Sequence, residues 1–174
     1  VTDTWDGAGG AAARLAFGTD GKLYMGIGAT RDASAQNPAS LRGKILRLND
    51  DGTPAQDNPF IGKEGYRPEI FTMGHRNPAG LAVNPNTGEL WASEYGPNGG
   101  DEINIIRAGK NYGWPIVEGR HDFHQSRPRG PTPITKPLIE HTHAEFRSLT
   151  GGIVYRGAKF ADLVGCYIYG DYST

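Results

Sequence analysis

Short apolar runs separated by tight turns recur along this chain. The runs Arg14–Phe17 and Lys22–Gly28 flank an Asp-Gly turn, and the same design returns over residues 81–93. The turn glycines of the two pairs, Gly21 and Gly88, lie 67 residues apart. An Asp-Gly turn between two apolar runs is typical of a β-hairpin. The pattern therefore predicts two hairpins of one repeated design.

Other short apolar segments extend this pattern, and no segment shows a convincing amphipathic helical pattern. The stretch 121–137 holds four prolines and predicts a long ordered loop. Many short strands with a repeated hairpin favour an all-β propeller, here about three blades of antiparallel sheet, over a sandwich or a barrel. Three blades cannot close a ring, so two sheet edges would be exposed. Further strands are predicted at Gly43–Leu48, Glu69–Met73, Glu102–Ile106, Gly152–Tyr155 and Cys166–Tyr169.

The composition excludes several classes of function. Of the 174 residues, 26 are glycine and 12 are proline, which indicates many turns. The net charge of −1 gives no electrostatic support for a nucleic-acid partner. No apolar run approaches the ~18 residues of a membrane span. Because Cys166 is the single cysteine, neither an internal disulfide nor a CxxC site is possible.

Both ends of the chain interrupt the strand pattern. Val1–Trp5 begins in the middle of the pattern, and Gly165–Tyr172 predicts a strand and a turn just before the sequence stops. We therefore expect residues 1–174 to be a fragment of a single β-propeller domain, truncated at both ends.

Three turn segments carry the candidate binding chemistry. In the loop Gly74–Gly80, Arg76 offers a fork of donors suited to carboxylates, although a solvated arginine that ties turns together also fits. The segment Glu94–Glu102 combines the carbonyls of a Gly/Pro turn with carboxylates, the ligand mixture that calcium takes, although an acidic surface turn also fits. The aromatic turn Asn111–Pro115 either packs the blades or presents the Tyr112 carbonyl to a cation.

Six short motifs in a fixed order carry a family resemblance. Together they resemble the glucose/sorbosone dehydrogenase family, which includes soluble quinoprotein glucose dehydrogenase and the bacterial aldose sugar dehydrogenases. The resemblance covers residues 10–115 closely, and Leu149–Gly157 with Gly170–Tyr172 is similar to a bacterial branch of the same family. The motifs are Gly43–Asn49, Asp57–Phe60, Gly74–Pro78, Glu94–Pro97, Asp101–Asn104 and Asn111–Trp114.

The resemblance implies a partial six-bladed propeller and an oxidoreductase activity. The family oxidises the C1 hydroxyl of an aldose sugar to the lactone. The cofactor is pyrroloquinoline quinone (PQQ), which accepts the hydride, and a calcium ion polarises the quinone carbonyl as a Lewis acid. The partners implied are the aldose and an external electron acceptor.

The motif matches also imply where the cofactor and the metal would bind. Arg76 and Asn77 would hold polar groups of PQQ, and Asp101 would lie near that site. One calcium would bind beside PQQ through two backbone carbonyls, and a second, structural calcium through a carboxylate and a carbonyl. The implied ligands are the carbonyls of Gly96 and Pro97 for the first ion, and the Glu102 carboxylate with the Tyr112 carbonyl for the second.

The sequence departs from the family at the general base. The family places a histidine four residues before an Arg-Leu pair, which here is Arg14-Leu15. The matching residue is Gly10, or Ala8 if a gap is allowed, and neither accepts a proton. General base catalysis contributes ~10²–10⁴-fold to a rate, so we expect weak or absent sugar oxidation from this chain. No other catalytic residue can be named from the sequence.

Two other functions remain open at this stage. A non-catalytic propeller used for binding is favoured by the missing histidine. A calcium-dependent lactonase suits the Gly96–Glu102 segment but not the His75–Pro78 motif. The family resemblance also implies a periplasmic or secreted protein.

Overall fold

The computed structural model describes residues 13–29, 33–98 and 100–172. Within these ranges the protein is all-β, as the sequence predicts, with no α-helix and two short 3₁₀ helices, η1 (Ala33–Gln36) and η2 (Ala161–Leu163). The predicted general-base positions, Gly10 and Ala8, lie outside the described residues.

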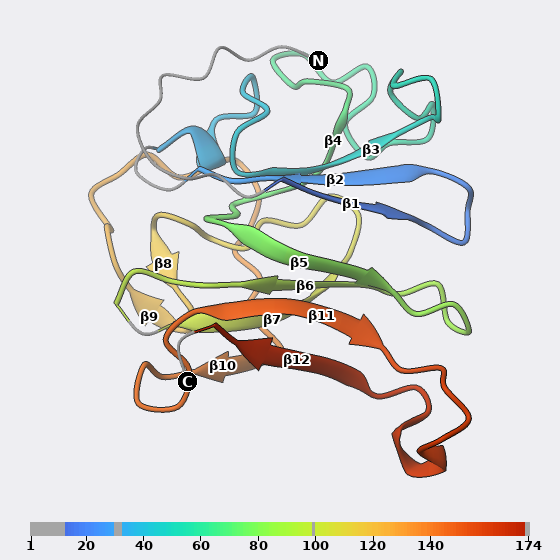
Figure 1. Ribbon diagram of the computed structural model, residues 1–174. Helices are drawn as coiled ribbons and strands as arrows, with labels where there is room; N and C mark the ends of the chain where they lie inside the picture. The colour runs from blue at the N-terminus through green and yellow to red at the C-terminus, as the bar shows by residue number, and fades with distance from the viewer. Residues whose placement is uncertain (1–12, 30–32, 99, 173–174) are drawn as a thin grey trace.

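Two four-stranded antiparallel sheets form most of the molecule (Figure 1). The strands of the first sheet follow chain order, and the second sheet does the same except that its outermost strand, β10, is reached through an insertion. This up-and-down order is the one expected of propeller blades. The first sheet contains β1 (Ala13–Phe17), β2 (Leu23–Ile27), β3 (Lys44–Leu48) and β4 (Ile70–Met73), and the second contains β5 (Pro78–Val83), β6 (Leu90–Glu94), β7 (Asp101–Ile106) and β10 (Ile139–His141).

Two smaller sheets complete the described structure. The hairpin β8–β9 (Val117–Glu118 and His121–Asp122) lies in the connection from β7 to β10. The pair β11–β12 (Leu149–Val154 and Tyr167–Asp171), called the third sheet below, begins a third blade. The stretch predicted as a loop, 121–137, is therefore a loop except for the short strand at its start.

Both predicted hairpins are present. In the first, β1 pairs with β2 around a turn in which Gly21 has φ +72°, a conformation that favours glycine. In the second, β5 pairs with β6 around a turn in which Gly88 has φ +74°. Both turns therefore place a glycine in the left-handed region, in two different blades.

The first strands of the first, second and third sheets, β1, β5 and β11, pack side by side, with β5 in the middle (Figure 1). The Arg14 Nε donates to the Ala79 carbonyl at 2.5 Å, and the Ser93 hydroxyl donates to the Gly151 carbonyl at 2.6 Å. A side chain at Gly80 would overlap the Gly151 carbonyl, so glycine is needed where β5 meets β11. These contacts fix the position of each blade relative to the next.

The core lies on both faces of the first sheet. β3 is buried along its whole length, so its alternating side chains enter two different clusters. Ile45 packs with Leu90 and Tyr112 in the cluster shared with the second sheet. Leu46 and Leu48 pack on the opposite side, in a cluster within the first sheet and its loops.

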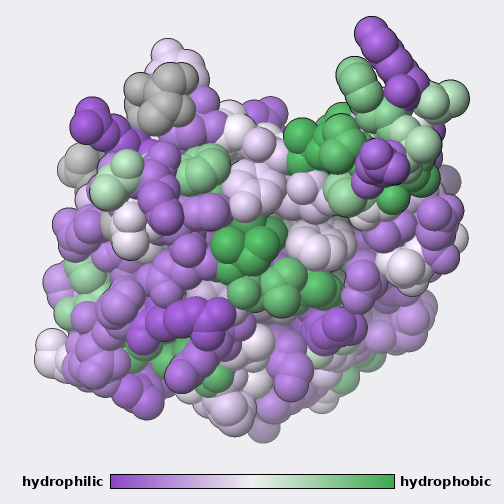
Figure 2. Space-filling view, turned by 90° about the horizontal axis from the view of Figure 1, so that it is seen from below, coloured by the Kyte–Doolittle hydropathy of each residue, from purple (hydrophilic) through white to green (hydrophobic). Residues whose placement is uncertain are grey.

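The first and third sheets leave large apolar side chains in contact with solvent. Leu15 and Phe17 of β1 are about 60% exposed, at 60% and 63%. Figure 2, seen from below the view of Figure 1, shows apolar groups lying among polar ones on that face. On the third sheet and its connection the exposed residues are Ile153, Phe160, Leu163, Val164, Ile168 and Tyr172.

Candidate cofactor and cation site

The turn that follows β4 carries His75, Arg76 and Asn77. Gly74 begins it with φ +81°, and a side chain there would overlap the Asn111 side chain and the Gly113 amide. Glycine at position 74 therefore lets the aromatic turn after β7 pack directly against this turn, and two of the predicted motifs meet.

Glu94, the last residue of β6, holds the turn in place. Its carboxylate is 2.5 Å from His75 Nδ1 and accepts hydrogen bonds from the backbone N–H groups of Arg76 (3.0 Å) and Asn77 (3.3 Å). The other His75 nitrogen is hydrogen-bonded to the Thr72 hydroxyl at 2.9 Å. Glu94, His75 and Asn77 are all buried. One buried carboxylate thus organises three consecutive residues.

The Arg76 guanidinium lies between two aromatic rings. Its carbon is 5.2 Å from the centre of the Tyr95 ring and 5.5 Å from that of Trp114. One terminal nitrogen donates to the Tyr95 carbonyl at 2.7 Å. Nε is buried and has no hydrogen-bond partner among the described residues. Burial lowers the pKa of Arg76 from its ordinary value, and no ion pair at salt-bridge distance offsets this among those residues. The group is a partly buried cation whose buried Nε still has a hydrogen bond to donate.

The loop from β6 to β7 carries the predicted carbonyl ligands. The Gly96 N–H donates to Asp101 Oδ1 at 2.9 Å, and the other Asp101 oxygen accepts from the Leu149 N–H at 2.7 Å. Asp101 is fully buried, whereas Pro97 is exposed. Asp101 therefore ties this loop to the third sheet.

A small cavity brings several predicted residues together. Its volume of about 10 Å³ suits one water molecule or one ion. Arg76, Gly96 and Glu102 line it, whereas Asn77, Pro97, Asp101 and Tyr112 do not. The full lining is Gly74, Arg76, Glu94, Tyr95, Gly96, Gly100, Glu102, Trp114 and Glu118.

Glu102 sits in a row of carboxylates. Glu94 and Glu140 are directly opposite it on the neighbouring strands, so the three side chains share one face. Burial first, and then the charge of Glu94, raises the pKa of Glu102 to about 8. Its oxygens accept from the Gly119 N–H at 2.6 Å and from the Asn104 amide at 2.9 Å.

Tyr112, the other predicted ligand of the structural calcium, is buried beside His75. Its ring stacks on the His75 ring at 4.9 Å, and its hydroxyl donates to the Ile105 carbonyl at 2.7 Å. In the ranges that the structure covers, no group of three or more His, Cys, Asp or Glu side chains is arranged to hold a metal ion. Any cation here would therefore rely on backbone carbonyls as well as on Glu102.

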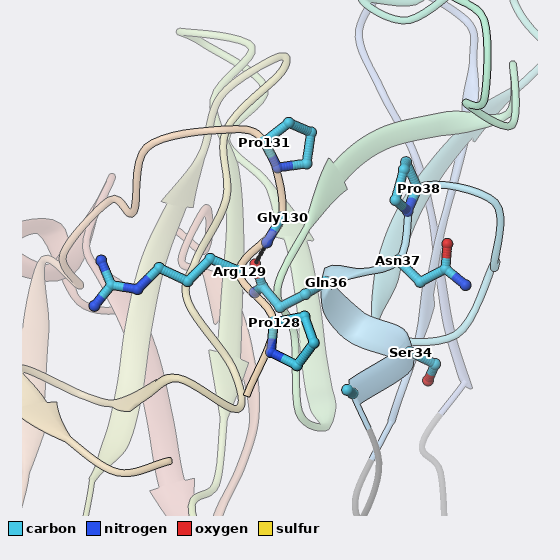
Figure 3. Close-up of a pocket in the computed structure, with 9 residues that line it drawn as sticks. Ser34, Gln36, Asn37, Pro38, Pro128, Arg129, Gly130 and Pro131 are labelled. Carbon is cyan, nitrogen blue, oxygen red and sulfur yellow. Dashed lines mark hydrogen bonds between the residues drawn. The ribbon is translucent and has the colours of Figure 1, made fainter. Parts of the chain in front are cut away.

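A larger hollow lies elsewhere. It has a volume of about 580 Å³ and separates η1 from the proline-rich loop, with Pro38 on one wall and Pro128 and Pro131 on the other (Figure 3). Gln36 spans its floor and accepts from the Gly130 N–H at 2.9 Å. None of the predicted cofactor or metal residues lines it.

The sequence profile of the Glucose / Sorbosone dehydrogenase family matches residues 2–173. The chain belongs to this family. Relatives of known name agree with the match. The aldose sugar dehydrogenase of Escherichia coli is 49% identical over 105 residues, covering 60% of this chain and 28% of the relative. Quinoprotein glucose dehydrogenase B of Acinetobacter calcoaceticus is 41% identical over 129 residues, covering 63% and 26%.

Solved structures of the family give the same fold. The soluble aldose sugar dehydrogenase from Escherichia coli matches with a TM-score of 0.77 and 37% identity over 91% of this chain and 47% of that one. The PQQ-bound aldose sugar dehydrogenase from Streptomyces coelicolor matches with 0.66 and 38% over 80% and 38%. These likenesses confirm that the two large sheets are blades of a β-propeller. The chain spans about a third or less of the length of the curated relatives it matches.

Sequence reasoning missed four residues of this site. Glu94 and Tyr95 stood inside a predicted motif but had no assigned role, Trp114 was assigned to a packing turn, and Glu118 was not singled out. Trp114 and Glu118 lie after β7 and line the cavity, but the sequence around them does not indicate that they belong to this site. A glutamate beside a glycine-rich turn is too common to be a signal by itself.

The raised pKa of Glu102 predicts a pH-dependent stability. Its folded pKa of about 8 exceeds the ordinary 4.5, so the folded state favours the protonated form. That contribution is complete below about pH 4.5 and is lost as pH rises through 8. In chelator we expect the free energy of unfolding to fall by about 1–2 kcal/mol in total between pH 5 and pH 8. The upper limit is ~1.4 kcal/mol for each pH unit, and we discount it because Glu102 is only partly buried. Urea unfolding across this range measures it.

The matched variants for this experiment are Glu102→Gln and Glu64→Gln. The first removes the titrating group and should flatten this part of the pH profile. The second alters an exposed glutamate in the connection between β3 and β4 and should leave the profile unchanged. A Glu102→Gln profile as steep as the parent's would assign the dependence to other groups.

Proposed function

We propose that this chain forms part of the cofactor cleft of a PQQ- and calcium-dependent aldose dehydrogenase, which oxidises aldose sugars to lactones and passes the electrons to an external acceptor. The proposal extends the sugar dehydrogenase function that the family and its relatives support in general. It also places the protein in the periplasm or outside the cell. In the ranges described, no helix is long and apolar enough to cross a membrane.

The partly buried Arg76 guanidinium, with its buried and unpartnered Nε, is the observation that carries this proposal. A desolvated cation with an unpartnered Nε is costly unless a ligand supplies an acceptor. PQQ is a planar quinone with carboxylate groups, and arginine is the side chain that best matches a carboxylate geometrically. When bound, PQQ supplies the two-electron oxidation of the sugar. Arg76 would orient it from between Tyr95 and Trp114, and Asn77 would hold a further polar group.

The loop from β6 to β7 would hold the calcium beside PQQ. The carbonyls of Gly96 and Pro97 are hard oxygen ligands of the kind calcium takes. Asp101 would help to position this site, because its carboxylate accepts the hydrogen bond of the Gly96 N–H. Calcium would act there as a Lewis acid on the quinone.

The second calcium would bind Glu102 and the Tyr112 carbonyl. The row of carboxylates around Glu102 supports this, because a divalent cation relieves the repulsion that raises the pKa of Glu102. Binding would require Glu102 to release its proton and to exchange at least one of its present donors.

A non-catalytic binding propeller is the second candidate function. Gly10 at the position of the family's general base favours it, since a glycine cannot take the proton of the sugar hydroxyl. Under either function we expect this chain alone to oxidise aldoses poorly or not at all. The two candidates differ in whether PQQ binds.

Cofactor binding is tested by thermal unfolding with PQQ and calcium, each alone and together. We expect PQQ with calcium to raise the melting temperature in proportion to the logarithm of its concentration, because a ligand that binds only the folded state stabilises it. Calcium alone should give a smaller rise. No shift with both ligands present would contradict the proposal and favour the binding propeller.

A further inference from the structure

Glu118 reaches from the β8–β9 hairpin into the loop from β6 to β7. Its Oε1 accepts hydrogen bonds from the Asn98 N–H at 2.7 Å and from the Gly100 N–H at 3.3 Å. The side chain is buried, at 7% exposure. Figure 1 shows the hairpin standing beside the ends of β6 and β7. A residue from outside the sheet therefore anchors the loop that carries the proposed calcium ligands.

The glycines of the loop are shaped around this carboxylate. A Cβ on Gly96 would lie 2.4 Å from Glu118 Oε1, and a Cβ on Gly100 would lie 2.9 Å from the Glu118 side chain. Neither glycine needs a positive φ here, since neither is among the positive-φ glycines of the described chain. Close approach of Glu118 is thus the physical reason for glycine at both positions.

Because the peptide group is planar, the hydrogen bond that fixes the Asn98 N–H also fixes the direction of the Pro97 carbonyl. The Pro97–Asn98 bond is trans, so its C=O and N–H point in opposite directions. Because the Asn98 N–H points at Glu118, the Pro97 carbonyl points away from it. The Tyr95–Gly96 peptide is held in the same way: its Gly96 N–H donates to Asp101, and its Tyr95 carbonyl accepts from Arg76 at 2.7 Å.

We propose that Glu118 is a positioning residue for the cation site: by holding the Asn98 and Gly100 amides, it fixes the Pro97 carbonyl in the direction in which it binds calcium. This inference rests on the proposed function for the identity of the cation, but the anchoring itself does not. Groups that orient metal ligands commonly change metal affinity by 10–100-fold when they are removed.

Two variants separate orientation from charge. Glu118→Ala removes the acceptor, so the loop peptides are free to rotate, and we expect calcium affinity to fall by about tenfold or more. Glu118→Gln keeps an acceptor oxygen at the same place without the charge, and we expect it to recover most of that affinity. Glu64→Ala, at an exposed glutamate in the connection between β3 and β4, is the control and should match the parent.

Calcium binding is measured by calorimetry on the whole chain with calcium chloride and PQQ, and the anchoring by amide hydrogen exchange in chelator. Without calcium, the Asn98 and Gly100 amides should be protected in the parent and in Glu118→Gln, and should exchange at least about tenfold faster in Glu118→Ala. If Glu118→Gln loses as much calcium affinity as Glu118→Ala, Glu118 acts by charge or as a ligand, and the positioning role is wrong.

The two measurements also separate this inference from the proposed function. Protected amides that Glu118→Ala exposes, in a parent that binds no calcium, would retain the anchor but overturn the cation site and the role of Glu118 in it. Unprotected amides in the parent would overturn the anchor itself. Calcium affinity that is unchanged in Glu118→Ala would overturn the positioning role while leaving the cation site intact.

Discussion

Replacing Arg76 by alanine is expected to weaken PQQ binding by about 100-fold or more. The guanidinium is desolvated between Tyr95 and Trp114, so an interaction with an anionic oxygen there is screened much less than at the surface. Removing one partner of a buried charged contact costs roughly 2–5 kcal/mol, and ~2.7 kcal/mol corresponds to 100-fold in affinity. Quenching of tryptophan fluorescence during titration with PQQ in calcium measures the dissociation constant.

Two further variants show whether the loss is specific. Arg76→Lys keeps the positive charge but neither the planar fork nor the stacking, so it should recover only a small part of the affinity. Arg107→Ala removes an arginine that is 62% exposed and pairs with Glu89 at 3.3 Å, and it should bind PQQ like the parent. If Arg76→Ala bound PQQ as tightly as Arg107→Ala, the guanidinium would have no part in cofactor binding.

The blades could be predicted from the sequence because their signals are local. An Asp-Gly turn between apolar runs specifies a hairpin within about a dozen residues, and the first hairpin forms with Gly21 in the left-handed region. The β8–β9 hairpin was missed because it has no such local signal. Its two strands of two residues each are too short to show alternation.

The candidate site was predicted only where one motif contains both the side chain and its surroundings. Arg76, Gly96 and Glu102 belong to such motifs, and the structure brings them to one cavity. Their supports come from farther along the chain: Trp114 is 38 residues after Arg76, and Glu118 is 20 residues after Asn98. Neither separation along the chain follows from a strand or turn pattern, because both depend on how the connection after β7 folds back.

The row of carboxylates around Glu102 could not be predicted from the sequence either. Glu94, Glu102 and Glu140 lie opposite one another through strand register, and the register follows from a β6–β7 loop and a long connection to β10. Sequence alone gives two acidic residues in a turn segment and a third far away. The elevated pKa of Glu102 is therefore a property of pairing, which no single motif contains.

Replacing Glu94 by alanine is expected to give the largest loss of stability, about 3–5 kcal/mol. Three donors, His75 Nδ1 and the N–H groups of Arg76 and Asn77, would lose their buried acceptor at once. A smaller opposing effect arises because Glu102 would lose a like charge, which lowers its pKa toward the ordinary value and eases its ionisation. Urea unfolding at pH 7 in chelator measures the net change.

Variants at the same and at a neighbouring position test this reasoning. Glu94→Gln keeps one acceptor oxygen and also removes the like charge beside Glu102, so it should cost clearly less than Glu94→Ala. Glu89→Ala, in the turn before the same strand, removes solvent-exposed contacts with the Arg107 guanidinium and the Thr87 hydroxyl and should cost about 0.2–1 kcal/mol. If Glu94→Ala were as mild as Glu89→Ala, the turn that carries Arg76 would be held by its own backbone and by the packing of Gly74 against Gly113. Glu94 would then be an acceptor that water can replace.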